Sequence, residues 1–235
     1  MCESCFHFHF SPFNWINAFT MFFTMKKKIL TLFAAAVVLM FATGARAQKL
    51  GFNVGYASEY FPAFTVPEHN QLNNPHLTGG FLNVTYTYNF SQYLGVTVGV
   101  GGRYNMRQYE STLLTFPAST KESQIVADVP VLLNLCIPLS DYSEVSLFGG
   151  PLVSFGITGK STNTESLYGQ SFEVPWYGEP AVYKRLNVQA TVGIALEVHH
   201  IRLMGGYSKG FLNIDGREGK HLTSSGIYLG VGYCL

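Results

Sequence analysis

The clearest pattern along this chain is the alternation of apolar and polar residues, and the segment 185–210 shows it best. Leu186 and Val188 fall on one parity, whereas Asn187 and Gln189 fall on the other. A period of two is typical of a β-strand that has one apolar face. The same pattern recurs along the chain and predicts eight strands, at residues 49–60, 80–90, 94–105, 128–139, 145–158, 185–198, 201–210 and 226–235.

The connections between these strands alternate in length. Long, polar connections are expected at 61–78, 106–122, 158–183 and 211–222, and short ones at 91–93, 140–144 and 199–200. This rhythm is typical of outer-membrane barrels, which have short periplasmic turns and long external loops. The pattern therefore predicts an all-β fold, an eight-stranded antiparallel up-and-down transmembrane β-barrel.

The short turns also predict a register, because directly paired residues of a hairpin lie on the same face of the sheet. The expected pairs are Phe90 with Leu94, Leu139 with Val145, and Val198 with Ile201. The last pair leaves His199 and His200 as a two-residue turn. A shared metal site is the alternative, but adjacent strand residues point to opposite faces, so we favour the turn.

The same register brings charged residues together on the polar face. It places Glu197 opposite Arg202, and we predict an ion pair inside the periplasmic mouth. Arg103, Asp128, Arg185, Asn187 and Gln189 share this face. Because buried charges need partners, we expect these residues to form a structural polar network in the lumen, rather than a permeation or catalytic site.

The face opposite the apolar one decides which way the barrel turns. It is rich in small residues, among them Gly95, Thr97, Gly99, Gly193, Gly206 and Gly230. Charged residues make up 12% of the chain, about half the usual share. Small side chains suit the narrow lumen of an eight-stranded barrel, so the apolar face is expected to meet lipid. A soluble, lipocalin-like ligand-binding barrel, with its apolar face inward, is the alternative.

The beginning of the chain predicts export. Lys26–Lys28 precede an apolar run, Ile29–Phe41, and the small-residue stretch Ala45–Ala47 follows. These are the three parts of a secretory signal peptide, which we place at 25–47. Residues 1–24 then form an upstream extension, from a start codon assigned too early. Cys2, Cys5, His7 and His9 resemble zinc ligands, but this short stretch offers no fold around them.

Residues 48–235 are expected to form one outer-membrane β-barrel domain. Removing Lys26, Lys27, Lys28, Arg46 and Glu3 leaves 11 Lys+Arg and 13 Asp+Glu, a net charge of −2. This balance does not predict a nucleic-acid partner. No cofactor or metal is predicted either. Only Cys136 and Cys234 remain, and their strands are expected on opposite sides of the barrel, so we do not predict a disulfide.

Two further features complicate the reading. Pro130 and Pro151 fall inside predicted strands, where a closed barrel has no free edge for a residue without an N–H group. Pro151 follows two glycines and predicts a bulge or kink, whereas Pro130 has no such explanation beyond its closeness to an external strand end. An enzyme reading would use His69, His76 or His221 with nearby hydroxyls. Proximity in sequence is weak evidence, and we do not predict an enzyme.

The motif order resembles that of the porin-family outer-membrane β-barrel proteins, the PorT-like group. The resemblance rests on "ARAQKLGFNVGY", "DVPVLLNL", "LFGGPLVSFGITG", "LMGGYSKGFLNI" and "GIYLGVGYCL", and it covers residues 48–235. It implies the fold and a location in the outer membrane, without a uniform activity or catalytic residues. The chain ends in Leu235 where such barrels often end in an aromatic residue.

These observations predict a non-enzymatic outer-membrane protein with a side-chain-filled lumen. Its long external loops would serve surface binding, envelope integrity or secretion support. The alternative is a narrow, porin-like channel. The aromatic-rich loop, with Tyr168, Phe172, Trp176 and Tyr177, is the expected contact surface unless it packs on itself. The expected partners are the bilayer, the barrel-assembly machinery and periplasmic chaperones.

Overall fold

The computed structural model describes residues 48–60, 76–113, 116–165, 171–177, 182–216 and 222–235. The signal peptide and upstream extension that we predict lie outside these residues. All described residues belong to one unit, Arg46–Leu235. Its strands are β1 (Gln48–Tyr60), β2 (His76–Asn89), β3 (Leu94–Leu113), β4 (Phe116–Ser140), β5 (Ser143–Glu165), β6 (Ser171–Pro175), β7 (Leu186–Val198), β8 (Ile201–Gly210) and β9 (Ser225–Cys234). None of the described residues forms a helix long and apolar enough to cross a membrane.

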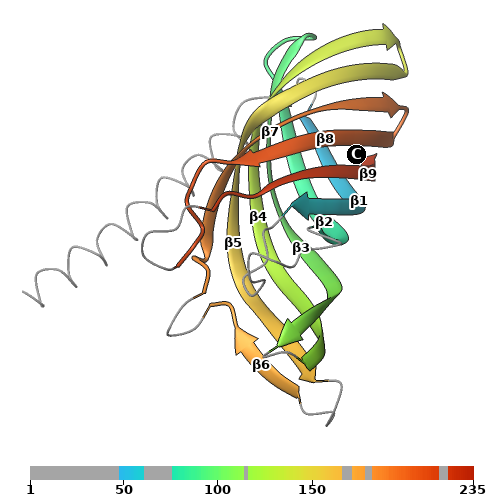
Figure 1. Ribbon diagram of the computed structural model, residues 1–235. Coiled ribbons are helices and arrows are strands. Elements are labelled where there is room, and N and C mark those ends of the chain that lie inside the picture. Colours follow the sequence, from blue (N-terminus) through green and yellow to red (C-terminus); the bar gives the residue numbers. More distant parts are fainter. Residues whose placement is uncertain (1–47, 61–75, 114–115, 166–170, 178–181, 217–221) are drawn as a thin grey trace, which may run out of the picture. The chain divides into compact units, whose positions relative to one another are not determined.

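Eight of these strands form a closed antiparallel ring. Hydrogen-bonded neighbours follow the order β4-β3-β2-β1-β9-β8-β7-β5, and the pairing of β4 with β5 closes it. The short strand β6 pairs with β5 beyond the ring, at the far end of the long strands (Figure 1). The predicted eight-stranded antiparallel barrel is therefore confirmed, because β5 pairs with β7, the other ring strands pair with their neighbours along the chain, and β9 pairs with β1.

The apolar parity of every strand points outward. Leu82, Val100 and Leu229 are 61–62% exposed, whereas the inward Asn53 and Thr97 are 1% and 4% exposed. A soluble barrel would bury the first set and expose the second. The lipocalin-like alternative is therefore wrong, and the outward surface is the one that an apolar bilayer requires.

Two of the three short turns have the register that the parity predicts. The turns at 91–93 and 199–200 keep their expected pairs. The pairing of Leu139 with Val145 is wrong, because Val145 lies opposite Ile137 and the register shifts just after it. This bulge leaves a shorter turn at residues 141–142.

Three strands are much longer than the alternation predicts. Strands β3, β4 and β5 contain 20, 25 and 23 residues, whereas about 9–11 residues cross a bilayer. The loop predicted at 106–122 is wrong, because most of it is paired strand up to Leu113 opposite Phe116. Part of the loop predicted at 158–183 also belongs to β5 and β6. We call β3 107–113, β4 116–124, β5 159–165 and β6 the projecting sheet.

Both prolines sit where a ladder between strands is interrupted. Between β3 and β4, pairing stops at Val98 opposite Val131 and resumes at Gly101 opposite Asp128, so Pro130 has no pair on that side. Between β4 and β5, pairing is absent around Pro151 but resumes in the same register. The register does not shift at Pro151, so of the predicted bulge or kink the bulge is absent. A local gap in the ladder accommodates the missing N–H group of each proline.

Candidate functional site

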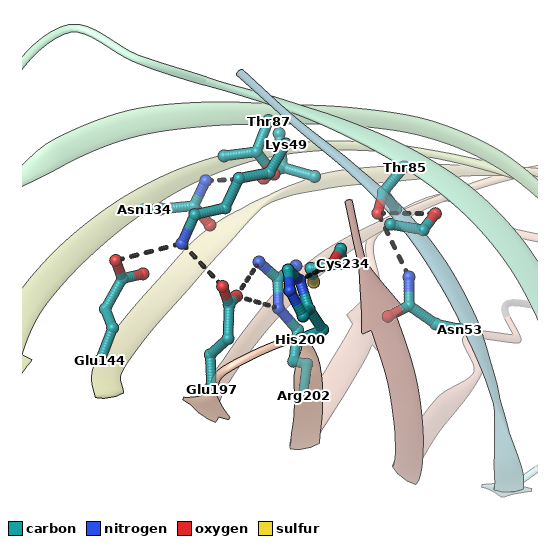
Figure 2. Close-up of polar contacts among 12 residues, drawn as sticks. Lys49, Asn53, Thr85, Thr87, Asn134, Glu144, Glu197, His200, Arg202 and Cys234 are labelled. Carbon is teal, nitrogen blue, oxygen red and sulfur yellow. Dashed lines mark hydrogen bonds and ion pairs between the residues drawn. The ribbon is translucent and has the colours of Figure 1, made fainter. Parts of the chain in front are cut away.

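The inward-facing charges gather in two groups, and the first lies at the short-turn end of the ring. Glu197 accepts hydrogen bonds at Oε2 from Arg202 Nε, at 3.2 Å, and Nη2, at 2.8 Å. Its Oε1 lies 2.8 Å from Lys49 Nζ, and Lys49 also lies 3.4 Å from Glu144 Oε2 (Figure 2). We call Lys49, Glu144, Glu197 and Arg202 the mouth cluster. The turn register alone predicts only the Glu197–Arg202 contact.

The two adjacent histidines form the turn that sets this register. His199 has a positive φ of 56°, which few residues other than glycine adopt. Its N–H donates to the Tyr142 carbonyl at 2.7 Å, and its ring stacks on Tyr142 with centroids 5.1 Å apart. His200 Nδ1 lies 2.8 Å from the Cys234 carbonyl. Each histidine thus joins its turn to a neighbouring strand or turn, and within the described ranges no three metal-binding side chains come together.

The second group of charges lies nearer the long loops. Arg103 Nη1 is 3.1 Å from Glu59 Oε2, and Arg103 Nε is 3.2 Å from Asp128 Oδ2. Ser154 donates to Asp128 at 2.6 Å, and Gln189 donates to Glu59 at 3.0 Å. We call Glu59, Arg103, Asp128 and Gln189 the loop-side cluster. Of these, Glu59 was not predicted, although its inward parity in the segment 49–60 was a usable signal.

Arg185 belongs to neither cluster, although it lines the same small cavity as Glu59 and Arg103, and its place in the lumen network stays a prediction. It immediately precedes β7 and is exposed. Its guanidinium donates to the carbonyls of Gly156, Ile157 and Tyr177 at 2.9–3.0 Å and lies 5.2 Å from the Tyr177 ring centroid. The strand parity does not apply to Arg185, because the strand begins one residue later.

The aromatic segment near the long-loop end packs inward. Trp176, Tyr183, Leu77, Val182 and Ile214 form a buried apolar cluster, which we call the cap. The Trp176 and Tyr183 rings meet edge to face at 5.0 Å. Trp176 is 1% exposed, so it is not the free contact residue that we expected.

The other aromatic residues of this segment, Tyr177 and Phe172, differ in exposure. Burial is the main cause that raises the pKa of Tyr177 to about 12, and the nearby Glu59 carboxylate is the second cause. Tyr177 lines a small cavity of about 20 Å³, which is also lined by Ile214 from the cap and by Arg103 and Glu59 from the loop-side cluster. The cap therefore lies directly against the loop-side cluster. Phe172 is 45% exposed, and Tyr168 lies outside the described residues.

A further buried ion pair, outside the two clusters, was missed because its residues were assigned to a loop. In the projecting sheet, Arg107 Nε donates to Glu122 Oε2 at 2.7 Å, and both side chains are fully buried. Glu122 Oε1 also accepts from Tyr109 at 3.1 Å and from Ser161 at 3.2 Å. Ser161 in turn accepts from Trp176 Nε1 at 2.7 Å. This chain of hydrogen bonds connects the projecting sheet to the cap.

The remaining candidate residues that the structure describes lie in separate places. Cys136 and Cys234 are buried free thiols. His76 begins β2 and lies 3.4 Å from the Ser58 hydroxyl, with both side chains exposed. His69 and His221 lie outside the described residues.

The family model for the outer membrane protein β-barrel domain matches residues 45–216 of this chain. The chain belongs to this family. No curated protein matches it. The family places the chain in the outer membrane, in contact with the lipid bilayer.

Several solved structures are similar in fold. One is a crystal structure of Ail, the attachment invasion locus protein of Yersinia pestis, in complex with the heparin analogue sucrose octasulfate. The sequence of Ail is 19% identical to this chain; the match covers 81% of this chain and 100% of that chain, with a TM-score of 0.44. Neisserial surface protein A is 12% identical, with coverages of 81% and 98% and a TM-score of 0.36. The translocator domain of the autotransporter NalP from Neisseria meningitidis is 9% identical, with coverages of 92% and 97% and a TM-score of 0.39. At these identities the likeness concerns the fold alone.

Proposed function

We propose that this protein is a surface-binding barrel, and that the projecting sheet is its contact surface outside the membrane. The observation that carries the proposal is the length of β3, β4 and β5, of 20, 25 and 23 residues, where about 9–11 cross a bilayer. The buried Arg107–Glu122 pair and the cap stabilise the base of this sheet. An ordered surface of this extent favours recognition of a partner at the cell surface.

The lumen supports a role in surface binding rather than in conduction, because charged clusters lie near both of its ends. The mouth cluster lies at the short-turn end, and the loop-side cluster and the cap lie at the other. The alternative, a narrow channel, requires a continuous path past these groups. We expect the protein refolded in a planar bilayer to show no steady current, whereas steady single-channel currents would support the channel instead.

Site-specific photo-cross-linking in intact cells tests the contact surface. Gln108 and Lys121 are exposed and lie opposite each other in the projecting sheet. Ser91, exposed in a short turn at the opposite end, is the matched control. We expect defined cross-linked products from positions 108 and 121 and none from 91. Products from position 91 alone would contradict surface binding and favour envelope integrity or secretion support.

Two narrower points belong to the same proposal. Membership of the PorT-like group rests on the order of the quoted motifs. The barrel-assembly machinery and periplasmic chaperones are expected partners, because an unclosed barrel would leave backbone groups unsatisfied in lipid. Depleting the assembly machinery should leave the chain protease-sensitive and without the gel mobility of a folded barrel; normal folding would argue against this partner.

A further inference from the structure

Large apolar side chains line much of the lumen between the two charged clusters, together with polar residues such as Asn53 and Thr191. Six half-buried side chains from five strands line it: Phe81, Leu132, Phe148, Leu152, Met204 and Tyr228. Two of the rings pack against wall positions that have no side chain. A Cβ atom at Gly193 would lie 2.4 Å from Phe148 Cζ, and one at Gly230 would lie 2.7 Å from Phe81 Cζ. The Phe148 and Phe81 side chains therefore pack directly against the backbone of the barrel wall.

These side chains surround a cavity of about 120 Å³. The predicted side-chain-filled lumen therefore contains an unfilled volume. The cavity reaches Lys49 and Arg202 at one end and Arg103 and Asp128 at the other. Apolar atoms that face an empty volume lose dispersion contacts. An apolar cavity of about 150 Å³ is known to stay dry and to bind benzene, so the volume here is of the size of a single ring.

We propose that this mid-lumen cavity is a binding site for a neutral molecule with one aromatic ring. A charged ligand is disfavoured, because the cations that line the cavity already have partners: Lys49 and Arg202 pair with Glu197, and Arg103 pairs with Asp128. An aromatic ring suits the walls, since Phe81, Phe148 and Tyr228 offer ring edges and faces. The Thr85 hydroxyl also lines the cavity; it donates to the Gly51 carbonyl and accepts from Asn53, so one lone pair remains to accept a hydrogen bond from a ligand hydroxyl.

The two methionines of the described residues provide a direct test. Met204 lines the cavity, whereas Met106 lies on the outer surface and is 39% exposed. The full-length protein is exported, purified from outer membranes, labelled with ¹³C at its methionine methyl groups and placed in lipid nanodiscs. Its two signals are assigned with the M106L and M204L variants. On titration with p-cresol, we expect a saturable shift of the Met204 methyl signal and little change at Met106.

Paired substitutions on β4 separate lumen binding from partition into lipid. Leu132→Phe adds volume inside the cavity, and Leu133→Phe makes the same change on the outward face, where Leu133 is 54% exposed. We expect L132F to weaken p-cresol binding at least tenfold and L133F to leave it unchanged. L152F is the second cavity-filling variant if L132F does not fold. Equal shifts at both methionines, no saturable shift, or full binding by both cavity-filling variants would overturn the proposal.

Discussion

Glu197 is the side chain on which the mouth cluster depends, because its two oxygens contact different cations. Replacing Glu197 by Ala removes the carboxylate from both Arg202 and Lys49, although Lys49 keeps a 3.4 Å contact with Glu144. Replacing Arg202 by Ala leaves Glu197 bound to Lys49 at 2.8 Å. Breaking a buried ion pair costs about 3–5 kcal/mol, whereas losing a charged hydrogen bond costs about 1.5–3 kcal/mol. We therefore expect E197A to lower the free energy of unfolding by about 3–5 kcal/mol and R202A by about 1.5–3 kcal/mol.

Urea unfolding in lipid vesicles measures both changes, followed by tryptophan fluorescence and by the gel mobility of the folded barrel. The double variant should lose less than the sum of the single variants, because both remove the same contact. Glu110→Ala is the control, since Glu110 is exposed in the projecting sheet. The reasoning would be refuted if R202A destabilised the barrel as much as E197A, or if neither changed the unfolding midpoint.

Three further predictions address the outward surface, the inner wall and the loop end. Leu229→Arg, in the middle of the outward face of β9, should cost about 2–4 kcal/mol in vesicles, and an unchanged urea midpoint would place this position outside the bilayer core. Gly193→Ala should destabilise the barrel by about 1–3 kcal/mol through overpacking, because the new Cβ would lie 2.4 Å from Phe148 Cζ and 2.5 Å from a backbone oxygen. Gly149→Ala is the control and should be tolerated in the same assay, because its new Cβ would have its nearest contact at 3.4 Å. Burial raises the pKa of Tyr177 from 10.0 to about 12, so the contribution of its neutral hydroxyl to stability is complete below pH 10 and is lost as the pH rises towards 12. Unfolding midpoints measured between these pH values should therefore fall for the wild type and fall less steeply for Y177F. Parallel curves for the two proteins would contradict this prediction.

The period-two pattern predicted most of the strands because it is a local property. It identified the outward residues and the two-residue turn at 199–200 without knowledge of the ring. It failed at 106–122, where polar residues follow one another on both faces and the apolar–polar contrast disappears. These residues remain in strands because they are paired across β3, β4 and β5, a stabilisation that a single segment does not reveal.

The candidate site was predictable only in part for the same reason. The Glu197–Arg202 contact lies across one turn, and the register of that turn was sufficient to predict it. The contacts of Lys49 with Glu144 and Glu197 join residues 95 and 148 positions apart, which meet only after β9 closes on β1. The cap was missed because Trp176 packs with Leu77 and Ile214, which come from two other parts of the chain.

The strand faces, the orientation towards lipid and most of the local register were predictable from the sequence, since each follows from the alternation of side chains along a strand. Three features were visible only in the folded barrel: which charges share a cluster, that the aromatic segment turns inward, and that a cavity lies between the two charged clusters. These features depend on the closure of the ring, which brings side chains from distant strands into one narrow space. There, the glycines at 193 and 230 leave room for rings that other strands supply.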